Sequence, residues 1–274
     1  MSKLGRALAR ATAQLSEVSD TPRLDAEVLM AAALGIGRDR LILAPPNVLP
    51  PDSFGDMLER RRAGEPVAYI TGQRAFWTID LEVGPGVLIP RPDSETLIAA
   101  AVEHFAGRAG PARILDLGTG PGTLLLAALD EWPGATGIGV DASPVALSFA
   151  QRNAERLGLA GRAAFQLGDW TAGLGGRFDL ILCNPPYVAT DAETGPGVAD
   201  YEPPEALFAG ADGLDDYRRL APAIGSLLAA GGLAAIEIGH DQADSAAALF
   251  IAAGHAPELA RDLANRPRAL LIRG

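Results

Sequence analysis

Apolar residues in the second part of the chain form short continuous runs, and amphipathic stretches separate these runs. The runs predict buried strands, and the helical spacing of the stretches between them predicts helices. The predicted strands are residues 113–117, 136–140, 163–167, 178–183, 233–238 and 268–272, and the predicted helices are residues 123–129, 145–157, 214–229 and 243–253. Strands that alternate with helices are typical of a parallel sheet. The pattern therefore predicts an α/β fold with a doubly wound parallel sheet.

The first part of the chain has a different pattern. Residues 4–15, 23–34 and 52–63 carry apolar side chains near helical spacing, which predicts a small helical domain over residues 1–75. This domain shows no cofactor-binding pattern, although it is fused to a complete α/β domain. We therefore expect it to dock the substrate.

Between these parts, residues 76–83 alternate between apolar and polar, and a Gly-Pro-Gly turn separates them from the apolar run 87–89. We expect a β-hairpin linker over residues 76–92, followed by the α/β domain over residues 93–274. Arg91 lies between two prolines in this linker. It either faces a carboxylate ligand or forms a salt bridge at the hinge.

Composition limits the classes of function. No run of about 18 apolar residues occurs, and the first residues do not begin a signal peptide, so we expect a cytoplasmic protein without membrane contact. The net charge of −11 argues against direct contact with nucleic acid, whose phosphates bind Lys and Arg. Because Cys183 is the only cysteine and the histidines are scattered, no metal site is expected.

A polar motif, Asn184-Pro185-Pro186-Tyr187, directly follows the predicted strand 178–183. Its two prolines fix φ and lack backbone donors, so the turn is stiff. Ligands of open α/β sheets bind at the carboxyl ends of the strands. The Asn184 side-chain oxygen and the Pro185 carbonyl can each accept one N–H of a planar NH2 group, and Tyr187 can stack on its plane. The alternative is a purely structural turn.

A glycine-rich loop, Gly118-Thr119-Gly120-Pro121-Gly122, follows the strand predicted at 113–117. Thr123 stands where dinucleotide-binding loops have Gly or Ala, which counts against NAD and FAD. Asp141 ends the next strand and is placed to bind ribose hydroxyls. Asp169 and Trp170 follow the third strand, where they could accept the adenine amine and flank its ring. S-adenosylmethionine has an adenine, a ribose and a charged tail but no phosphate, and therefore fits this set. Singly, Asp141 could be a helix cap and Trp170 a core aromatic.

Residues 188–212 show neither a helical nor a strand period, which predicts a long loop. Acidic residues are frequent in residues 191–216, where no Lys or Arg occurs. We interpret this segment as an acidic rim that guides a basic part of a protein substrate to the site. The alternative is a solvated loop without a role.

With these motifs, the chain resembles the bacterial N5-glutamine methyltransferases that modify peptide chain release factors. The matching residues are Asp25-Ala26-Glu27, Gly64-Glu65-Pro66, Phe76-Trp77, Leu88-Ile89-Pro90-Arg91-Pro92, Asp116 to Gly122, Asp169-Trp170, Asn184 to Tyr187 and Tyr201-Glu202-Pro203. The Asn-Pro-Pro-Tyr motif alone is shared with adenine and cytosine amino-methyltransferases, whereas the helical N-terminal part with Ile-Pro-Arg-Pro is more specific. The chain departs from the family pattern at Pro121, where Thr or Ser is frequent, and at Ser94, where Thr is usual.

The resemblance implies a mostly parallel, seven-stranded, Rossmann-like methyltransferase sheet. It also implies that a methyl group passes from S-adenosylmethionine to the side-chain amide nitrogen of a glutamine in class 1 release factors. The implied catalytic residues are Asn184, Pro185, Pro186 and Tyr187, and the implied cofactor-binding residues are Gly118, Thr119, Gly120, Pro121, Gly122, Asp141, Asp169, Trp170 and Asn184. No metal is required, and we expect a monomer.

Three other functions stay open on the sequence. Glutamine methylation of a large-subunit ribosomal protein is chemically identical, and only the N-terminal part and the hinge argue against it. An adenine-N6 methyltransferase of nucleic acid would use the same motif, but the net charge of −11 argues against it. A non-catalytic cofactor-binding module that serves as a scaffold for RNA assembly is disfavoured by the intact motif at Asn184.

Overall fold

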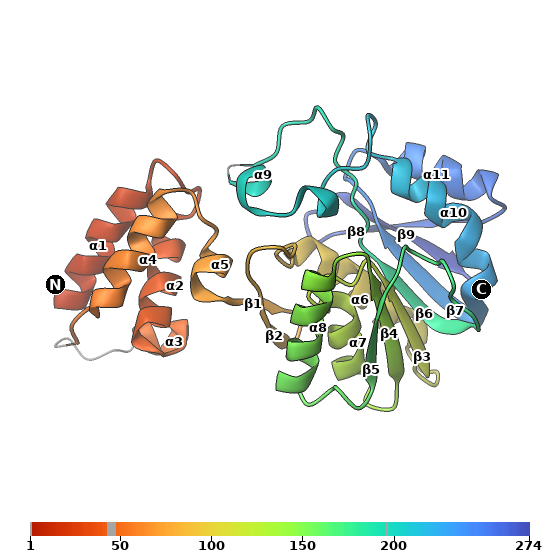
Figure 1. Ribbon diagram of the computed structural model, residues 1–274, viewed down its shortest axis with the longest axis horizontal. Coiled ribbons are helices and arrows are strands. Elements are labelled where there is room, and N and C mark those ends of the chain that lie inside the picture. The colour runs from red at the N-terminus through yellow and green to blue at the C-terminus, as the bar shows by residue number, and fades with distance from the viewer. Residues whose placement is uncertain (1, 43–47, 196) are drawn as a thin grey trace. The chain divides into compact units, whose positions relative to one another are not determined.

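The computed structural model describes residues 2–42, 48–195 and 197–274, and its chain divides into two compact units (Figure 1). A helical unit contains the residues up to Gln73 together with Thr194–Tyr201, and an α/β unit contains Arg74–Glu193 and Glu202–Gly274. No helix of the described residues is long and apolar enough to span a membrane.

The helical unit has its own apolar core. Its helices are α1 (Lys3–Leu15), α2 (Pro22–Leu34), α3 (Arg38–Ile42), α4 (Asp52–Arg62), α5 (Val67–Thr71) and the short α9 (Val198–Tyr201). The Ser2 hydroxyl caps α1 by accepting the Gly5 N–H, and Pro22 occupies the first turn of α2. Leu8, Leu29 and Phe54 belong to the shared core. The three helices predicted from the spacing of apolar residues are therefore confirmed.

The predicted hairpin exists, but its strands lie elsewhere. β1 (Gln73–Phe76) and β2 (Ile79–Glu82) form a two-stranded sheet, so the prediction of one strand over residues 76–83 is wrong. Trp77 adopts a positive φ of 53° in the turn between them. Its backbone N–H donates to Glu95 and its indole N–H donates to Glu131, which holds this turn. Residues 87–89 form no strand.

The α/β unit is built on a seven-stranded sheet with the order β5-β4-β3-β6-β7-β9-β8. The strands are β3 (Arg113–Leu117), β4 (Thr136–Asp141), β5 (Ala163–Leu167), β6 (Phe178–Cys183), β7 (Leu228–Glu237), β8 (Glu258–Arg261) and β9 (Pro267–Arg273). Neighbouring strands from β5 to β7 run parallel, and β9 runs antiparallel to both β7 and β8. The structure thus confirms the α/β fold with a mostly parallel, seven-stranded sheet.

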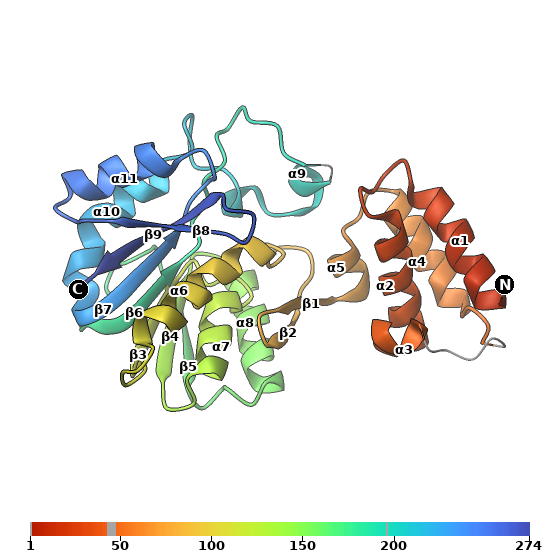
Figure 2. The ribbon, with the colours of Figure 1, turned by 180° about the vertical axis from the view of Figure 1, so that it is seen from behind.

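Helices cover both faces of this sheet (Figures 1 and 2). The helices are α6 (Glu95–Phe105), α7 (Thr123–Glu131) and α8 (Pro144–Arg156), which pack side by side, and α10 (Asp215–Leu227) and α11 (Ala243–Ala252), which form a second pair. A 3-10 turn, η1 (Pro92–Ser94), leads directly into α6. The sheet is therefore doubly wound, as predicted.

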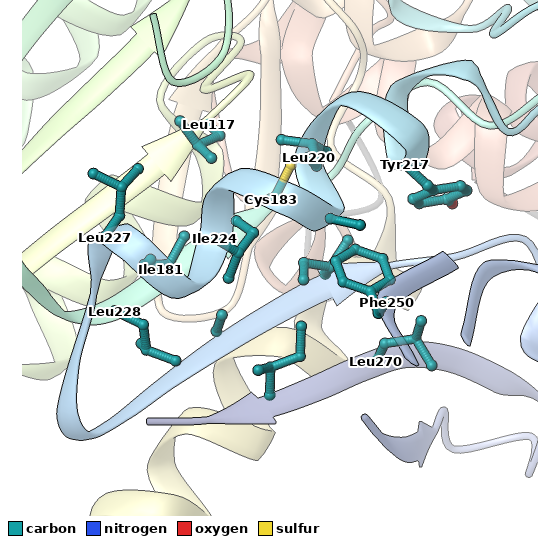
Figure 3. Close-up of a cluster of buried hydrophobic side chains, with 14 of the residues drawn as sticks. Leu117, Ile181, Cys183, Tyr217, Leu220, Ile224, Leu227, Leu228, Phe250 and Leu270 are labelled. Carbon is teal, nitrogen blue, oxygen red and sulfur yellow. The ribbon is translucent and has the colours of Figure 1, made fainter. Parts of the chain in front are cut away.

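The core between the sheet and α10 consists of buried, mostly apolar side chains (Figure 3). Leu220, Ile224 and Leu227 recur at helical spacing on α10 and are buried in a cluster with Ile181 of β6 and Phe250 of α11. Burial of such side chains stabilises the fold by about 1.5–3 kcal/mol each. This packing holds β3, β6 and β7 in register, so the loops at their carboxyl ends have defined positions.

Candidate active site

A cavity of about 610 Å³ lies at the carboxyl ends of β3, β4 and β6. Parallel pairing of Leu117 with Cys183 brings the ends of β3 and β6 together. The predicted site residues that line the cavity are Gly118, Thr119, Gly120, Pro121, Asp141, Asp169, Trp170, Asn184 and Pro186. Gly122, Pro185 and Tyr187 are not among the described residues that line it. The structure therefore gathers most of the predicted site in one place.

The glycine loop is shaped by its contact with the residues after β5 and β6. Gly118 has a positive φ of 71°, and a Cβ there would lie 3.2 Å from the Trp170 ring and 3.8 Å from the Asn184 carbonyl oxygen. A larger residue would be strained in this conformation and would displace the indole. Loop, indole and Asn184 thus form one continuous wall.

Asn153 of α8 is a fully buried residue that the sequence patterns did not identify. Its Nδ2 donates to the carbonyl oxygens of Pro121 (2.9 Å) and Glu82 (3.0 Å), and its Oδ1 accepts the Glu82 N–H at 2.7 Å. The side chain therefore clamps the glycine loop to β2. Pro121 takes part in this clamp through its carbonyl oxygen, so its lack of an N–H does not affect the hydrogen bond.

Asp141 ends β4 at the cavity wall. Its Oδ2 accepts the Gly120 N–H and its Oδ1 accepts the Ser143 N–H, both at 2.8 Å. Burial raises the pKa of Asp141, and the backbone N–H groups of Ser143 and Gly120 oppose that rise. Each carboxylate oxygen has a second lone pair, so Asp141 can also accept ligand hydroxyls. Its ribose role stays a prediction, and its support of the loop is an additional finding.

Asp169 and Trp170 follow β5 but have different surroundings. Trp170 has a positive φ of 50°, and its indole N–H donates to Asp216 at 3.0 Å. The ring is thereby fixed against Gly118, in position to flank a planar ligand. Asp169 is exposed, and its carboxylate pairs with Arg219 at 2.5 Å. Its predicted contact with an adenine amine would therefore compete with this arginine.

The Asn-Pro-Pro-Tyr turn is held at both ends by polar contacts. Asn184 Nδ2 donates to the Ser94 hydroxyl at 3.1 Å, and the Tyr187 hydroxyl donates to Glu237 Oε1 at 3.3 Å. Burial raises the pKa of Tyr187 well above its usual value. Ser94 precedes α6, yet its side chain makes no capping bond and faces Asn184 instead. Neither Ser94 nor Glu237 was among the predicted site residues.

Arg91 forms a salt bridge, which was one of the two roles predicted for it. Its guanidinium pairs with Glu202, a buried residue whose other oxygen accepts the Ile89 N–H at 2.9 Å. Arg91 also lines the cavity. Glu202 is buried here and therefore adds no exposed charge to the predicted acidic rim, whereas Asp212 is exposed and pairs with Arg218. The guiding role of the segment stays a prediction. The segment also contains α9 and a 3-10 turn, which the sequence did not indicate.

Comparison with known proteins adds independent information. Residues 6–72 match the model of the PrmC N-terminal domain, and residues 110–212 match that of a methyltransferase domain. The release factor glutamine methyltransferase of Rhodospirillum rubrum is 44% identical over 277 residues, which cover 98% of this chain and 85% of that protein. The chain belongs to the release factor glutamine methyltransferase family.

Further similarities agree with this membership. The release factor glutamine methyltransferase of Caulobacter vibrioides is also 44% identical, over 92% of this chain and 89% of that protein. A methyltransferase from Pyrococcus furiosus has the same fold, with a TM-score of 0.55, 17% identity, and coverage of 80% of this chain and 98% of that one. The resemblance inferred from the motifs is thus confirmed at the level of the release factor glutamine methyltransferase family.

Asp116, at the end of β3, is a buried carboxyl in the cavity wall. Its Oδ2 accepts the Thr119 hydroxyl at 2.6 Å and the Leu125 N–H at 3.1 Å, whereas its Oδ1 has no partner among the described residues. Burial raises the pKa of Asp116 to about 7. A buried oxygen without a donor is costly, which fits a site that binds a cationic group beside it. The charged tail of S-adenosylmethionine carries such a group.

Asp116→Asn is expected to stabilise the ligand-free protein at alkaline pH and to weaken S-adenosylmethionine binding. Because the folded state holds the Asp116 proton more tightly than the unfolded state, the free energy of unfolding should fall as pH rises from about 4 to about 7. Asparagine removes the contribution of residue 116 to this pH dependence of stability. The contribution of Glu237, whose pKa is also raised to about 7, remains. Thermal unfolding against pH and calorimetric titration measure both effects.

Asp179→Asn is the matched control, since the Asp179 carboxylate also accepts two hydrogen bonds, here from the Ala112 and Arg113 N–H groups, but is only half-buried. Its variant should keep the wild-type pH dependence. An Asp116→Asn protein that loses stability with pH as steeply as the wild type would contradict the interpretation of Asp116.

Proposed function

We propose that the protein transfers the methyl group of S-adenosylmethionine to the side-chain amide nitrogen of a glutamine in peptide chain release factors. One observation carries the proposal: the glycine loop and Asn184 line the same cavity at adjacent strand ends. The names of the curated relatives support this substrate. Action on a translation factor would take place in the cytoplasm.

The residues of the cavity fit the proposed cofactor. The glycine loop and Asp141 would bind its ribose, and Trp170 would flank its adenine. Asp116 Oδ1, which has no partner in the described part of the chain, would attract its charged tail. When bound, S-adenosylmethionine supplies an electrophilic methyl group on a sulfonium. The wall formed by Gly118, Trp170 and Asn184 would bring this group beside the glutamine site.

An amide nitrogen is a weak nucleophile because its lone pair is conjugated with the carbonyl. The Asn184 side-chain oxygen and the Pro185 carbonyl would each accept one N–H of the glutamine. These two hydrogen bonds would draw the nitrogen lone pair out of conjugation and toward the methyl carbon of S-adenosylmethionine. The nitrogen becomes acidic after methylation and then loses its proton. Positioning and polarisation would therefore supply most of the catalysis.

The helical unit is proposed to dock the protein substrate. All cavity-lining residues belong to the α/β unit, so a chain that begins at Arg74 should still bind S-adenosylmethionine. Its methylation of an intact release factor should be slower by roughly tenfold or more, the effect of losing about 1.4 kcal/mol of docking energy. Calorimetry and initial rates test both statements. Equal rates for the shortened and full chains would contradict a docking role.

A direct assay distinguishes the alternatives. The purified protein is incubated with labelled S-adenosylmethionine in separate reactions, each of which contains one candidate substrate: a release factor, large-subunit ribosomal proteins, DNA or RNA. Label is expected in the release factor. Label in a ribosomal protein or in nucleic acid, but not in the release factor, would establish one of the other functions. Cofactor binding without transfer to any substrate would favour the scaffold.

A further inference from the structure

Glu237, the last residue of β7, is a fully buried carboxylate with no role in the mechanism above. Parallel pairing of Cys183 with Ile236 places it next to the start of the Asn-Pro-Pro-Tyr turn. Its Oε1 accepts the Tyr187 hydroxyl, and the Ser94 hydroxyl also interacts with its carboxylate. Oε2 has no hydrogen-bond partner among the described residues. Glu237 thus contacts one end of the motif directly and approaches the other through Ser94.

Ser94 determines which atom of Asn184 can face it. A hydroxyl has a single proton, and an ionised carboxylate can only accept. When Glu237 is ionised, the Ser94 proton is directed to it, and the Ser94 oxygen can then only accept a hydrogen bond from Asn184. Asn184 meets this requirement with Nδ2, at 3.1 Å. Its Oδ1 is consequently the atom left for another partner.

We propose that Glu237 and Ser94 are positioning residues that hold the Asn184 amide with its oxygen toward the substrate, while Glu237 also holds the Tyr187 ring. The inference rests on the proposed function, because the glutamine NH2 group can only donate and therefore needs an acceptor. An inverted Asn184 would present its own NH2 group to that donor and would repel it. Asn and Gln oxygen and nitrogen are nearly equal in size, so hydrogen-bond partners, rather than packing, decide between the two orientations.

The protonation state of Glu237 enters through the same contacts. Charged and titratable groups surround it from several elements: Arg268 of β9, Asp93 of η1, Tyr187, Tyr217 of α10 and Cys183 of β6. Burial raises the pKa of Glu237 to about 7, against the lowering effects of Ser94, Arg268 and Tyr187. A protonated Glu237 can donate to Ser94, which frees the Ser94 proton for Asn184 Oδ1 and favours the inverted amide. Turnover should therefore decrease as the pH falls through this range.

The first test compares Ser94→Ala with Ser94→Thr, which retains a hydroxyl. Ser94→Ala should lower kcat on the order of tenfold, the value of about one positioning hydrogen bond, and Ser94→Thr should stay within about twofold of wild type. S-adenosylmethionine affinity, measured by calorimetry, should change little in both. Ser226→Ala, which removes an exposed hydroxyl of α10, is the matched control. A Ser94→Ala enzyme with the wild-type kcat would overturn the proposal.

The second test uses the pH profile of kcat for the wild type, Glu237→Gln and the control Glu258→Gln, which alters an exposed glutamate of β8. The wild type and the control should lose turnover below about pH 7, whereas Glu237→Gln should be slower and lack this decrease. A merely structural role would lower the rate without changing the profile. The same decrease in Glu237→Gln would overturn the proposal, and the Ser94 pair decides the question if that variant does not fold.

The orientation can also be followed without a substrate. The side-chain amide NMR signals of Asn184 should shift with pH in the wild type and lose this dependence in Ser94→Ala. A wild type that transfers no methyl group to glutamine would reject the proposed function, while these signals would still decide the orientation. Signals that are insensitive to pH in the wild type would overturn the role of Glu237.

Discussion

Asn184→Ala is expected to lower the rate of methyl transfer by about 10²–10³ while the protein folds as the wild type does. Removal of one preorganised polar partner from an active site typically has this effect. Among the described residues, the side chain makes a single hydrogen bond, to Ser94, and it is only partly buried. Steady-state kinetics on a release factor, together with thermal unfolding, measure the two parts of the expectation.

Asn153→Ala provides the contrast. Asn153 is fully buried and makes three hydrogen bonds that clamp the glycine loop, so its removal should reduce the free energy of unfolding on the order of 2–3 kcal/mol. A folded Asn184→Ala protein with nearly wild-type turnover would exclude Asn184 from catalysis. A loss of stability in Asn184→Ala as large as in Asn153→Ala would show a structural role instead.

Asp141→Ala is expected to weaken S-adenosylmethionine binding by roughly tenfold to a hundredfold. Hydrogen bonds to a charged acceptor contribute about 1.5–3 kcal/mol, and the ribose hydroxyls would lose theirs. The Gly120 N–H would also lose its acceptor, which loosens the glycine loop and adds to the effect. Calorimetric titration with the cofactor gives the change in affinity directly.

Ser143→Ala separates the ribose contact from the start of α8. Ser143 caps this helix by accepting the Ala146 N–H, so its removal should lower stability by about 1 kcal/mol and alter affinity only slightly. If Asp141→Ala bound the cofactor as tightly as the wild type, Asp141 would be only a support for the loop.

The fold could be predicted because its central strands β3, β6 and β7 are apolar runs that are largely buried on both faces. β8 was missed because its residues are mostly exposed and show no alternation. The hairpin was misplaced because Trp77 and its neighbours alternate like a strand, although polar partners in Glu95 and Glu131 pull Trp77 into a turn. Such partners lie 18 and 54 residues away along the chain, and no local pattern reports them.

The site was predictable where a residue lies at or just after the end of a strand. Asp141, Trp170, Asn184 and residues 118–121 of the glycine loop have this position, and all line the cavity. Ser94 reads locally as a helix cap, and Glu237 reads as the polar end of a strand. Ser94 contacts Asn184, which lies 90 residues away along the chain, and Glu237 contacts Tyr187, which lies 50 residues away. Only the folded sheet brings these residues together.

The central claim is that the cavity serves methyl transfer to a glutamine amide. The most direct test is peptide mapping by tandem mass spectrometry of a release factor that has been incubated with the protein and labelled S-adenosylmethionine. One added methyl group on the side-chain nitrogen of a single glutamine is expected, and far less modification in the same time with Asn184→Ala. A methyl group on any other residue type, or equal modification by Asn184→Ala, would contradict the claim.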